Sequence, residues 1–259
     1  MSNDSIAKTV TVATLLCIVC SVLVSAAAVG LKPIQEFNKT LETKKNILKV
    51  AGLMKPGIVI EEAFKKISVR IVDLSTGEIK TDPGLENYDQ KMAAKDPASS
   101  IRIPDSQDLG KIKRRAKLAS VYMVTDQDRI ETLILPIHGK GLWSTMYAFL
   151  ALEGDANTIK GYTFYEHAET PGLGGEVDNP SWQKQWVGKK LFTQDWNLAL
   201  DILKGQVDPS KPEAVHQVDG LSGATLTTVG VENFMLYWLG DNGFGPFLAK
   251  LRARGGSNG

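Results

Sequence analysis

A cluster of hydroxyl side chains precedes the last long apolar segment of the chain. Residues 217–240 read QVDGLSGATLTTVGVENFMLYWLG, and this stretch contains Ser222, Thr225, Thr227 and Thr228. Ser222 suits the N-cap of a helix, and Thr225 takes the third position after it, where a capping box would place Glu or Gln. The first turn of such a helix offers a phosphate unpaired N–H groups and the positive end of the helix dipole. The stretch therefore predicts a phosphate site, with an ordinary capped helix as the simpler interpretation.

The same stretch comes close to the nucleophile elbow G-x-S-x-G of serine hydrolases. Residues 220–224 read GLSGA, so Ala224 stands where that motif has its last glycine. In the α/β-hydrolase order the general base follows the serine. The histidines of this chain all precede Ser222: His138, His167 and His216. A serine hydrolase is therefore a disfavoured alternative.

Two glycine-rich stretches upstream support the phosphate interpretation. The segment ETPGLGGE contains Thr170-Pro171-Gly172, which suits a type II turn, and Gly174-Gly175, which lets backbone approach a ligand closely. The segment HGKGLWST places Trp143 beside a glycine bend, where an aromatic ring could stack on a planar ligand. Lys189 and Lys190 could balance a phosphate charge, although each of these features alone is typical of an ordinary loop.

The N-terminus predicts a single membrane-spanning helix over residues 9–31. The 23 residues between Lys8 and Lys32 carry no charge, and about 20 apolar residues span a bilayer as a helix. A cleaved signal peptide is the alternative, because residues 25–28 read SAAA, but its apolar region would be only about 7–15 residues long. Apolar residues at helical spacing predict that the helix continues toward Gly52.

Charge and cysteine content exclude several classes of function. The formal net charge is +1, which argues against a strongly basic nucleic-acid-binding protein. Both cysteines, Cys17 and Cys20, lie inside the apolar span, where cysteine behaves as a small apolar residue. The rest of the chain therefore has no disulfide, no thiolate nucleophile and no cysteine-ligated metal.

The remaining pattern predicts an α+β domain in which helices pack on one antiparallel sheet. Apolar alternation predicts strands over residues 67–74, 119–125, 129–137, 143–152 and 158–167, with hairpin turns at 126–128 and 154–157. A loop or a short helix is expected over residues 81–108. The basic run 111–117 (KIKRRAK) predicts the solvated face of a helix, with a phospholipid site as the alternative. Further helices are expected over residues 180–187, 196–203 and 222–239. Gly240 is expected to end the last helix, whose buried stripe is Val231, Phe234, Met235, Trp238 and Leu239.

Residues 219–225, DGLSGAT, match every specified position of the motif D-x-x-S/T-G-A-T, in which a flavin transferase attaches FMN to the final threonine. Together with ETPGLGGE, GLWS and the N-terminal span, this motif makes the chain resemble the FMN-binding domain family with covalently bound FMN. Over its whole length the chain resembles the C subunits of the bacterial Na+-translocating NADH:quinone oxidoreductases. The G subunit of Rnf-type ferredoxin:NAD oxidoreductases carries the same motif and is the alternative within the family.

The resemblance implies that Thr225 is the covalent tether of FMN rather than a catalytic residue. It implies an electron-carrying subunit of a membrane oxidoreductase, with the soluble domain on the periplasmic side of the inner membrane. NADH oxidation, Na+ passage and quinone reduction would belong to other subunits, and the flavin transferase would supply Mg2+ and the activating base. No metal ligand is expected in the chain. The residues expected to line the flavin are Asp219, Ser222, Gly223, Ala224, Leu142, Trp143, Ser144, Thr145, Glu169, Thr170, Leu173, Gly174 and Lys189.

We expect four segments along the chain. A short tail (1–8) precedes the transmembrane helix (9–31), which is followed by a membrane-proximal helix with the first part of the soluble domain (32–110) and by the FMN-binding domain (111–259). Outside the resemblance, the residues also fit a membrane-anchored module that binds a free phosphorylated ligand. The expected partners are other subunits of the complex, the flavin transferase and the lipid bilayer, and no nucleic acid.

Overall fold

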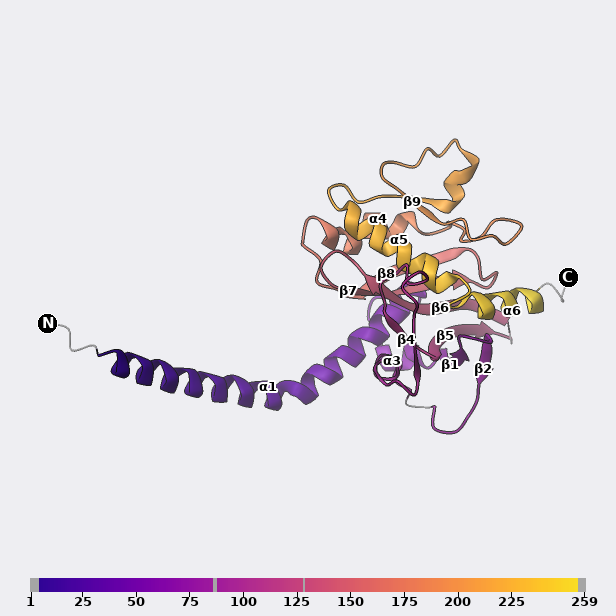
Figure 1. The fold of residues 1–259 in the computed structure, drawn as a ribbon. Helices are drawn as coiled ribbons and strands as arrows, with labels where there is room; N and C mark the ends of the chain where they lie inside the picture. Colours follow the sequence, from indigo (N-terminus) through magenta and orange to yellow (C-terminus); the bar gives the residue numbers. More distant parts are fainter. Residues whose placement is uncertain (1–4, 86–87, 128, 256–259) are drawn as a thin grey trace. The chain divides into compact units, whose positions relative to one another are not determined.

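The computed structural model describes residues 5–85, 88–127 and 129–255 (Figure 1). It consists of two compact units, Met1–Thr43 and Lys44–Gly259. Its helices are α1 (Ile6–Val50), α2 (Ile60–Phe64), α3 (Gln90–Lys95), α4 (Pro180–Gln185), α5 (Thr225–Leu239) and α6 (Gly245–Gly255), with 3-10 helices η1 (Gly174–Asp178) and η2 (Pro212–His216). Its strands are β1 (Ile67–Asp73), β2 (Glu78–Lys80), β3 (Ser100–Arg102), β4 (Arg114–Ala116), β5 (Leu118–Asp126), β6 (Arg129–Lys140), β7 (Thr145–Glu153), β8 (Ile159–Glu166), β9 (Asp201–Leu203) and β10 (Gln217–Asp219).

Helix α1 carries the predicted membrane span and continues beyond it. Its apolar part is long enough to cross a bilayer, and the side chains of residues 9–31 are exposed. The helix passes Pro33 and ends at Val50, and Gly52 after it takes a φ of +74°. The N–H of Gly52 bonds to the carbonyl of Lys49 and the N–H of Leu53 to that of Leu48, which is a Schellman end. The expected helical continuation toward Gly52 is therefore confirmed.

The second unit is built on one antiparallel sheet. The sheet has six strands in the order β2-β1-β5-β6-β7-β8, and every neighbouring pair is antiparallel. The predicted strand at 67–74 and both predicted hairpins are confirmed, although Asp128 of the first turn lies outside the described residues. Strand β2 follows a turn at Ser75-Thr76-Gly77 and was not expected, because three residues are too few for a periodic pattern. In this sheet, β1 and β2 come before residue 110 in the sequence and β5 to β8 come after it.

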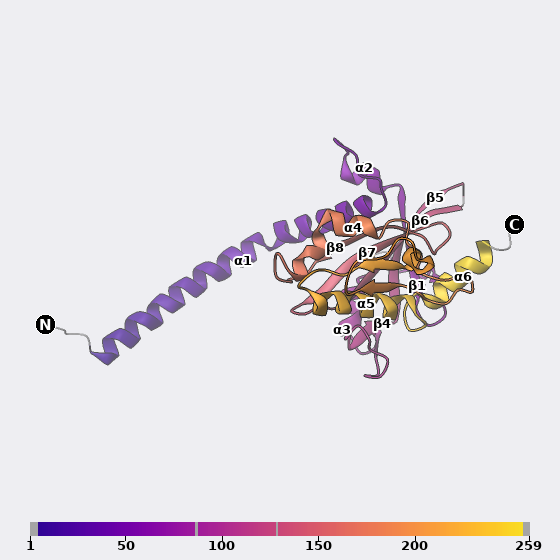
Figure 2. The ribbon, with the colours of Figure 1, turned by 90° about the horizontal axis from the view of Figure 1, so that it is seen from above.

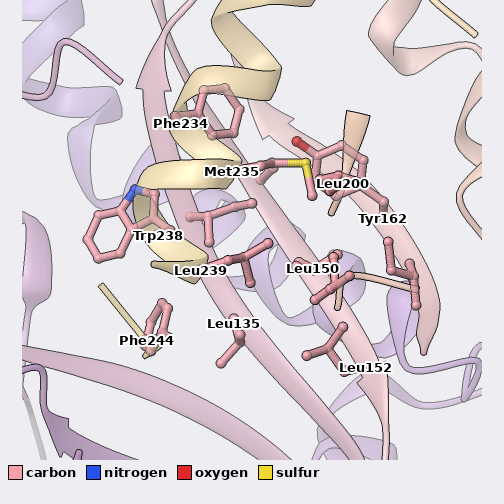
Figure 3. Close-up of a cluster of buried hydrophobic side chains, with 14 of the residues drawn as sticks. Leu135, Leu150, Leu152, Tyr162, Leu200, Phe234, Met235, Trp238, Leu239 and Phe244 are labelled. Atoms are coloured by element: carbon pink, nitrogen blue, oxygen red, sulfur yellow. The ribbon is translucent and has the colours of Figure 1, made fainter. Parts of the chain in front are cut away.

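Helix α5 covers one face of the sheet and lies against β6 (Figure 1). The predicted stripe is confirmed, since all five of its residues are at most 1% exposed. Figure 3 shows Phe234, Met235 and Trp238 among sheet side chains such as Leu135 and Leu150. The opposite face of the sheet packs against the last turn of α1, where Ile47 and Leu48 are buried.

Short helices complete the domain. Helix α4 lies beside β8 (Figure 2) and begins as predicted at Asn179-Pro180, with the Asn179 side chain accepting a hydrogen bond from the N–H of Ser181 at 2.9 Å. The expected loop or short helix over residues 81–108 contains α3 and β3.

The helix expected over residues 196–203 is wrong. Residues 201–203 form β9, which pairs in parallel with β10, and Phe192 bridges to Leu198 around a turn. Four apolar residues of this segment recur at every second position, which is the period of a strand: Trp196, Leu198, Leu200 and Ile202. Four residues are too few for this period to distinguish a strand from a helix.

The helix face expected over residues 111–117 is also wrong. Residues 114–116 form β4, which pairs with β3, and the residues before them form an irregular loop. Ile112 and Ala116 stand four residues apart, as in a helix, but Arg115 and Ala116 are both buried. Pairing with β3 therefore overrides the weak helical spacing.

Close contact between α5 and the end of β6 yields a test of this packing. A Cβ added at Gly230 would lie 2.5 Å from the backbone oxygen of Lys140. We expect Gly230→Ala to lower the free energy of unfolding by about 1–3 kcal/mol through this overlap, although Ala normally stabilises a helix relative to Gly. Urea unfolding of the detergent-solubilised chain, followed by tryptophan fluorescence, measures the change.

Val229→Ala is the matched control for this substitution. Val229 is exposed on the same helix, and its replacement should change the free energy of unfolding by no more than about 0.5 kcal/mol. A Gly230→Ala variant that is as stable as the wild type would contradict the described contact.

Candidate functional site

The carboxylate of Glu169 joins three segments of the domain. It accepts hydrogen bonds from the N–H groups of Leu142 (3.1 Å), Trp143 (3.0 Å) and Ser144 (3.0 Å). It also accepts from the hydroxyls of Ser144 (3.1 Å) and Thr227 (2.8 Å). Glu169 is 5% exposed, so these bonds replace its hydration. The carboxylate therefore fixes the segment before β7 and the first turn of α5 relative to each other.

Two opposing effects set the pKa of Glu169. Burial acts to raise this pKa, because it disfavours the charged form. The hydrogen bonds from Thr227, Ser144, Trp143 and Leu142 stabilise the charge and together outweigh burial, so the pKa lies below the ordinary value of 4.5. Glu169 is therefore ionised at neutral pH.

Helix α5 begins later than the sequence pattern suggests. It starts at Thr225, and its N-cap residue is Ala224, which provides no side-chain cap. The expected N-cap Ser222 is wrong, because Gly223 at a φ of +73° turns the chain and the N–H of Ala224 bonds to the carbonyl of Leu221. Ser222 is exposed before this turn.

The hydroxyls of this stretch have separate roles. Thr227 is buried and donates to Glu169, whereas Thr228 is buried and shapes the turn, accepting from the N–H of Leu221 and donating to the carbonyl of Ala224. Thr225 is exposed, and its hydroxyl has no hydrogen-bond partner in the described part of the chain. Thr225 is therefore the free hydroxyl of the first helical turn.

The first turn of α5 has the donor groups that a phosphate needs. Within the described residues, the N–H groups of Thr225, Leu226 and Thr227 make no backbone hydrogen bond, as is usual at a helix start. They stand at the positive end of a helix of 15 residues. This turn can accept an anion beside the free hydroxyl of Thr225.

Apolar side chains surround this turn. Trp143 is 67% exposed and Leu226 65%, and Leu142 and Leu173 are also exposed. Leu173 approaches the turn, since a Cβ added at Gly223 would lie 3.3 Å from its Cδ2 atom. We call these four residues the apolar rim. Exposed apolar side chains around an anion site suit a ligand that combines a phosphate with a planar ring.

The structure brings together several of the expected site residues. Leu142, Trp143 and Ser144 bond to Glu169, and Gly174 packs beside it, since a Cβ there would lie 2.5 Å from the hydroxyl oxygen of Thr227. Gly223 and Ala224 form the turn before Thr225.

Other expected site residues have different surroundings. Lys189 donates to the carbonyl of Ala214 at 2.6 Å, and Asp219 accepts from the N–H of Val207 at 2.7 Å. Both line a hollow of about 600 Å³ that no residue bonded to Glu169 lines. The side chains of Thr170 and Thr145 are exposed, and each makes no hydrogen bond within the described residues.

Sequence reasoning missed two residues of this site. Thr227 carries a bond to Glu169, and Leu226 is a member of the apolar rim. The motif points only to Thr225, and a threonine two positions later gave no signal of its own because its partner is 58 residues away in sequence. No histidine in the described residues bonds to Ser222, which removes the support for a serine hydrolase.

Comparison with known proteins identifies the family. Residues 141–240 match the family model of the FMN-binding domain. The C subunit of the Na(+)-translocating NADH-quinone reductase of Vibrio vulnificus is 52% identical over 255 residues, which cover 98% of this chain and 98% of that protein. Its counterpart in Pseudomonas aeruginosa is 49% identical over 255 residues, 97% of this chain and 98% of that protein. The chain belongs to the NqrC family.

Structural similarity agrees with this family. The crystal structure of Shewanella oneidensis NqrC matches with a TM-score of 0.75 and 37% identity, covering 83% of this chain and 99% of that one. The matched FMN-binding domain of this NqrC family member includes Glu169, Thr225 and the whole apolar rim.

The residues present fit an FMN. The unpaired N–H groups at the start of α5 suit its phosphate, and the apolar rim suits its ring. Gly174 and Gly223 allow the close packing around this turn, since a Cβ at Gly174 would lie 2.5 Å from the hydroxyl oxygen of Thr227 and the φ of Gly223 is +73°.

The bonds at Glu169 predict a pH-dependent loss of stability. Glu169→Gln puts an amide NH2 donor where the other donors converge, and we expect it to lower the free energy of unfolding at pH 7 by about 2 kcal/mol. Because the folded pKa of Glu169 is lowered, its contribution is present above about pH 4.5 and is lost as the pH falls through the folded pKa. Urea unfolding between pH 7 and pH 3 measures this difference.

Glu153→Gln serves as the control, because Glu153 is an exposed carboxylate at the end of β7. It should leave the stability within about 0.5 kcal/mol of the wild type at pH 7. A loss of stability in Glu169→Gln that stays constant down to pH 3 would show that the charge of Glu169 is not the cause.

Proposed function

We propose that this chain is the electron-carrying flavoprotein subunit of a Na+-translocating NADH:quinone oxidoreductase, with FMN attached to Thr225 by a phosphoester bond. The observation that carries the proposal is the exposed, unpartnered hydroxyl of Thr225 at the first residue of α5, within DGLSGAT. The relatives in Vibrio vulnificus and Pseudomonas aeruginosa are named as the C subunit of that reductase.

The neighbouring hydroxyls are less suited to attachment. Thr227 and Thr228 are buried and bonded, so a bulky group on either would break the contacts that hold the turn. Ser222 is exposed but precedes the turn at Gly223, away from the helix start. Among the described hydroxyl side chains of residues 217–240, only that of Thr225 is both exposed and part of the first helical turn, whose N–H groups are unpaired.

Attachment requires a flavin transferase as a partner. The bond that forms joins the hydroxyl oxygen of Thr225 to the FMN phosphorus of FAD, and the bond that breaks releases AMP. The hydroxyl proton passes to a base of the transferase. The resulting phosphodiester keeps one negative charge in the field of the helix start, which favours it electrostatically.

The chain would hold the cofactor and shape its surroundings. The N–H groups at the start of α5 would hold the phosphate, and Leu142, Trp143 and Leu173 would hold the ring. Bound FMN supplies reversible electron transfer at its isoalloxazine ring. Ser144, Glu169 and Gly174 position these contacts. The remaining expected residues stay predictions: Thr145, Thr170, Lys189, Asp219, Ser222, Gly223 and Ala224.

The membrane arrangement belongs to the same proposal. The apolar part of α1 anchors the chain in the bilayer of the bacterial inner membrane, and residues 111–259 form the FMN-binding domain on the periplasmic side. Other subunits of the oxidoreductase supply the electron donor and acceptor, and oxidise NADH, move Na+ and reduce quinone.

Fluorescence on a denaturing gel tests the covalent bond. The chain expressed with a flavin transferase should fluoresce under ultraviolet light at its own mass, 28.2 kDa for the polypeptide. Thr225→Val removes the nucleophile and should abolish the band. Thr81→Val, which changes an exposed threonine with no hydrogen bond within the described residues, should retain it. A band that persists in Thr225→Val would refute attachment there, and flavin lost from the wild type on denaturation would indicate a non-covalent ligand.

Cysteine labelling tests the periplasmic orientation. The two native cysteines lie in the apolar part of α1, so one cysteine introduced at the exposed residue Ser106 provides a reporter. A membrane-impermeant maleimide should label Ser106→Cys in intact spheroplasts as fully as in lysed ones, whereas the wild type should stay unlabelled. Labelling that requires lysis would place the domain in the cytoplasm.

A further inference from the structure

The basic run at residues 111–117 lies on a hairpin next to the candidate flavin site. Strands β3 and β4 pair antiparallel, and the loop between them spans residues 103–113. Residues 100–117 hold six basic and two acidic side chains, in a chain whose formal net charge is +1. Positive charge is therefore concentrated on this hairpin.

Two arginines stand directly opposite each other on the hairpin. Arg102 and Arg114 are register partners, and like charges in such positions destabilise a strand pair. Arg114 donates to the hydroxyl of Ser100 at 2.7 Å. Neither arginine forms an ion pair with a carboxylate within the described residues. The guanidinium charges of Arg102 and Arg114 can therefore pair with a negatively charged group outside this hairpin.

Two lysines of the loop are held in an unfavourable backbone conformation. Lys111 has a φ of +50° and Lys113 a φ of +68°, a region that glycine and asparagine adopt more readily. The carboxylate of Asp108 fixes the loop by accepting from the N–H groups of Ile112 and Lys113, both at 2.7 Å. Both lysines are exposed and have no ion-pair partner in the described part of the chain. Lysine therefore stands at two positions where glycine or asparagine would adopt the backbone conformation with less strain.

The hairpin also exposes apolar side chains among these charges. Leu109 is 50% exposed and Ile101 is 40% exposed. Arg115, in contrast, is buried and donates to the carbonyl of Ala116, so it does not belong to this surface. We call Arg102, Leu109, Lys111, Lys113 and Arg114 the basic surface. Apolar contact area with positive charge at its rim is the pattern of a protein docking site.

The basic surface adjoins the apolar rim of the flavin site. The N–H of Lys140 donates to the carbonyl of Gly110 at 2.8 Å. The ammonium of the same Lys140 donates to the carbonyl of Trp143 at 2.8 Å. Lys140 therefore links Gly110, the residue before Lys111, to the segment that carries Leu142 and Trp143, so the loop end of the basic surface lies beside the apolar rim.

We propose that the basic surface and the exposed edge of Trp143 together form the docking site for an acidic surface of the redox partner subunit. The inference rests on the proposed function, because it takes the flavin site to be where electrons enter or leave. Positive charge beside an exposed cofactor attracts and orients an acidic partner and leaves the apolar edge for close contact. The position of the loop beside this edge favours a protein partner, because polar phospholipid headgroups would not bury the exposed edge of Trp143.

Zero-length cross-linking of the assembled complex tests the proposal. A water-soluble carbodiimide joins a lysine ammonium to a carboxylate in direct contact, and peptide mass spectrometry identifies the pair. We expect Lys111 and Lys113 to link to Asp or Glu of another subunit. The exposed lysines Lys184 and Lys204 serve as controls and should give at least about fivefold fewer such links. The same result is expected in a complex carrying Thr225→Val, so it is independent of flavin attachment.

Charge removal gives the second readout. Asparagine tolerates positive φ, so the double variant Lys111→Asn/Lys113→Asn should fold at least as well as the wild type. After mixing with NADH at low ionic strength, its flavin should be reduced about three- to tenfold more slowly, and added KCl should remove the difference. The control Lys184→Asn/Lys204→Asn should match the wild type.

Two results would overturn the proposal. One is an absence of links from Lys111 and Lys113 to any subunit, with flavin reduction unchanged in the double variant. The other is binding of the wild type, but not of the double variant, to phosphatidylglycerol vesicles without protein cross-links, which would assign the basic surface to lipid.

Discussion

The buried carboxylate of Glu169 is the interaction on which the site depends. A charge in a buried position is costly unless hydrogen bonds replace its water. Here the bonds come from residues 142–144 and from Thr227, which are separated from Glu169 in sequence but meet at one carboxylate. Removing this charge would leave several donors unsatisfied at once. The segment that carries Trp143 and the helix that begins at Thr225 are therefore held as one rigid unit.

The position of α5 follows from a second constraint, which is close packing. Its apolar stripe is buried on the sheet, and Gly230 lets the helix backbone contact Lys140 at the end of β6. Because the helix cannot move away from the sheet without exposing this stripe, its first turn always faces the same loops. Packing thus places the start of the helix, and Glu169 fixes its orientation.

Polar groups around the site divide between structure and function. Thr227 and Thr228 use their hydroxyls to hold the turn, whereas the hydroxyl of Thr225, the proposed attachment point, makes no hydrogen bond in the described part of the chain. Lys140 connects the flavin site to the basic surface through Gly110 and Trp143. The cofactor and a partner would then meet on one contiguous face of the domain. This arrangement suits a subunit that passes electrons on rather than one that transforms a substrate by itself.

The sequence alone determined the membrane span, the central strands, the buried stripe of α5 and the motif at Thr225, because each depends on local period or on residue type at fixed spacing. Only the tertiary structure decided that α5 begins at Thr225, that residues 201–203 pair as a strand and that part of the basic run pairs with β3 in a hairpin. It also decided the role of Glu169, whose partner Thr227 lies 58 residues away. These features depend on contacts between distant segments, which override local propensity and leave no periodic trace in the sequence.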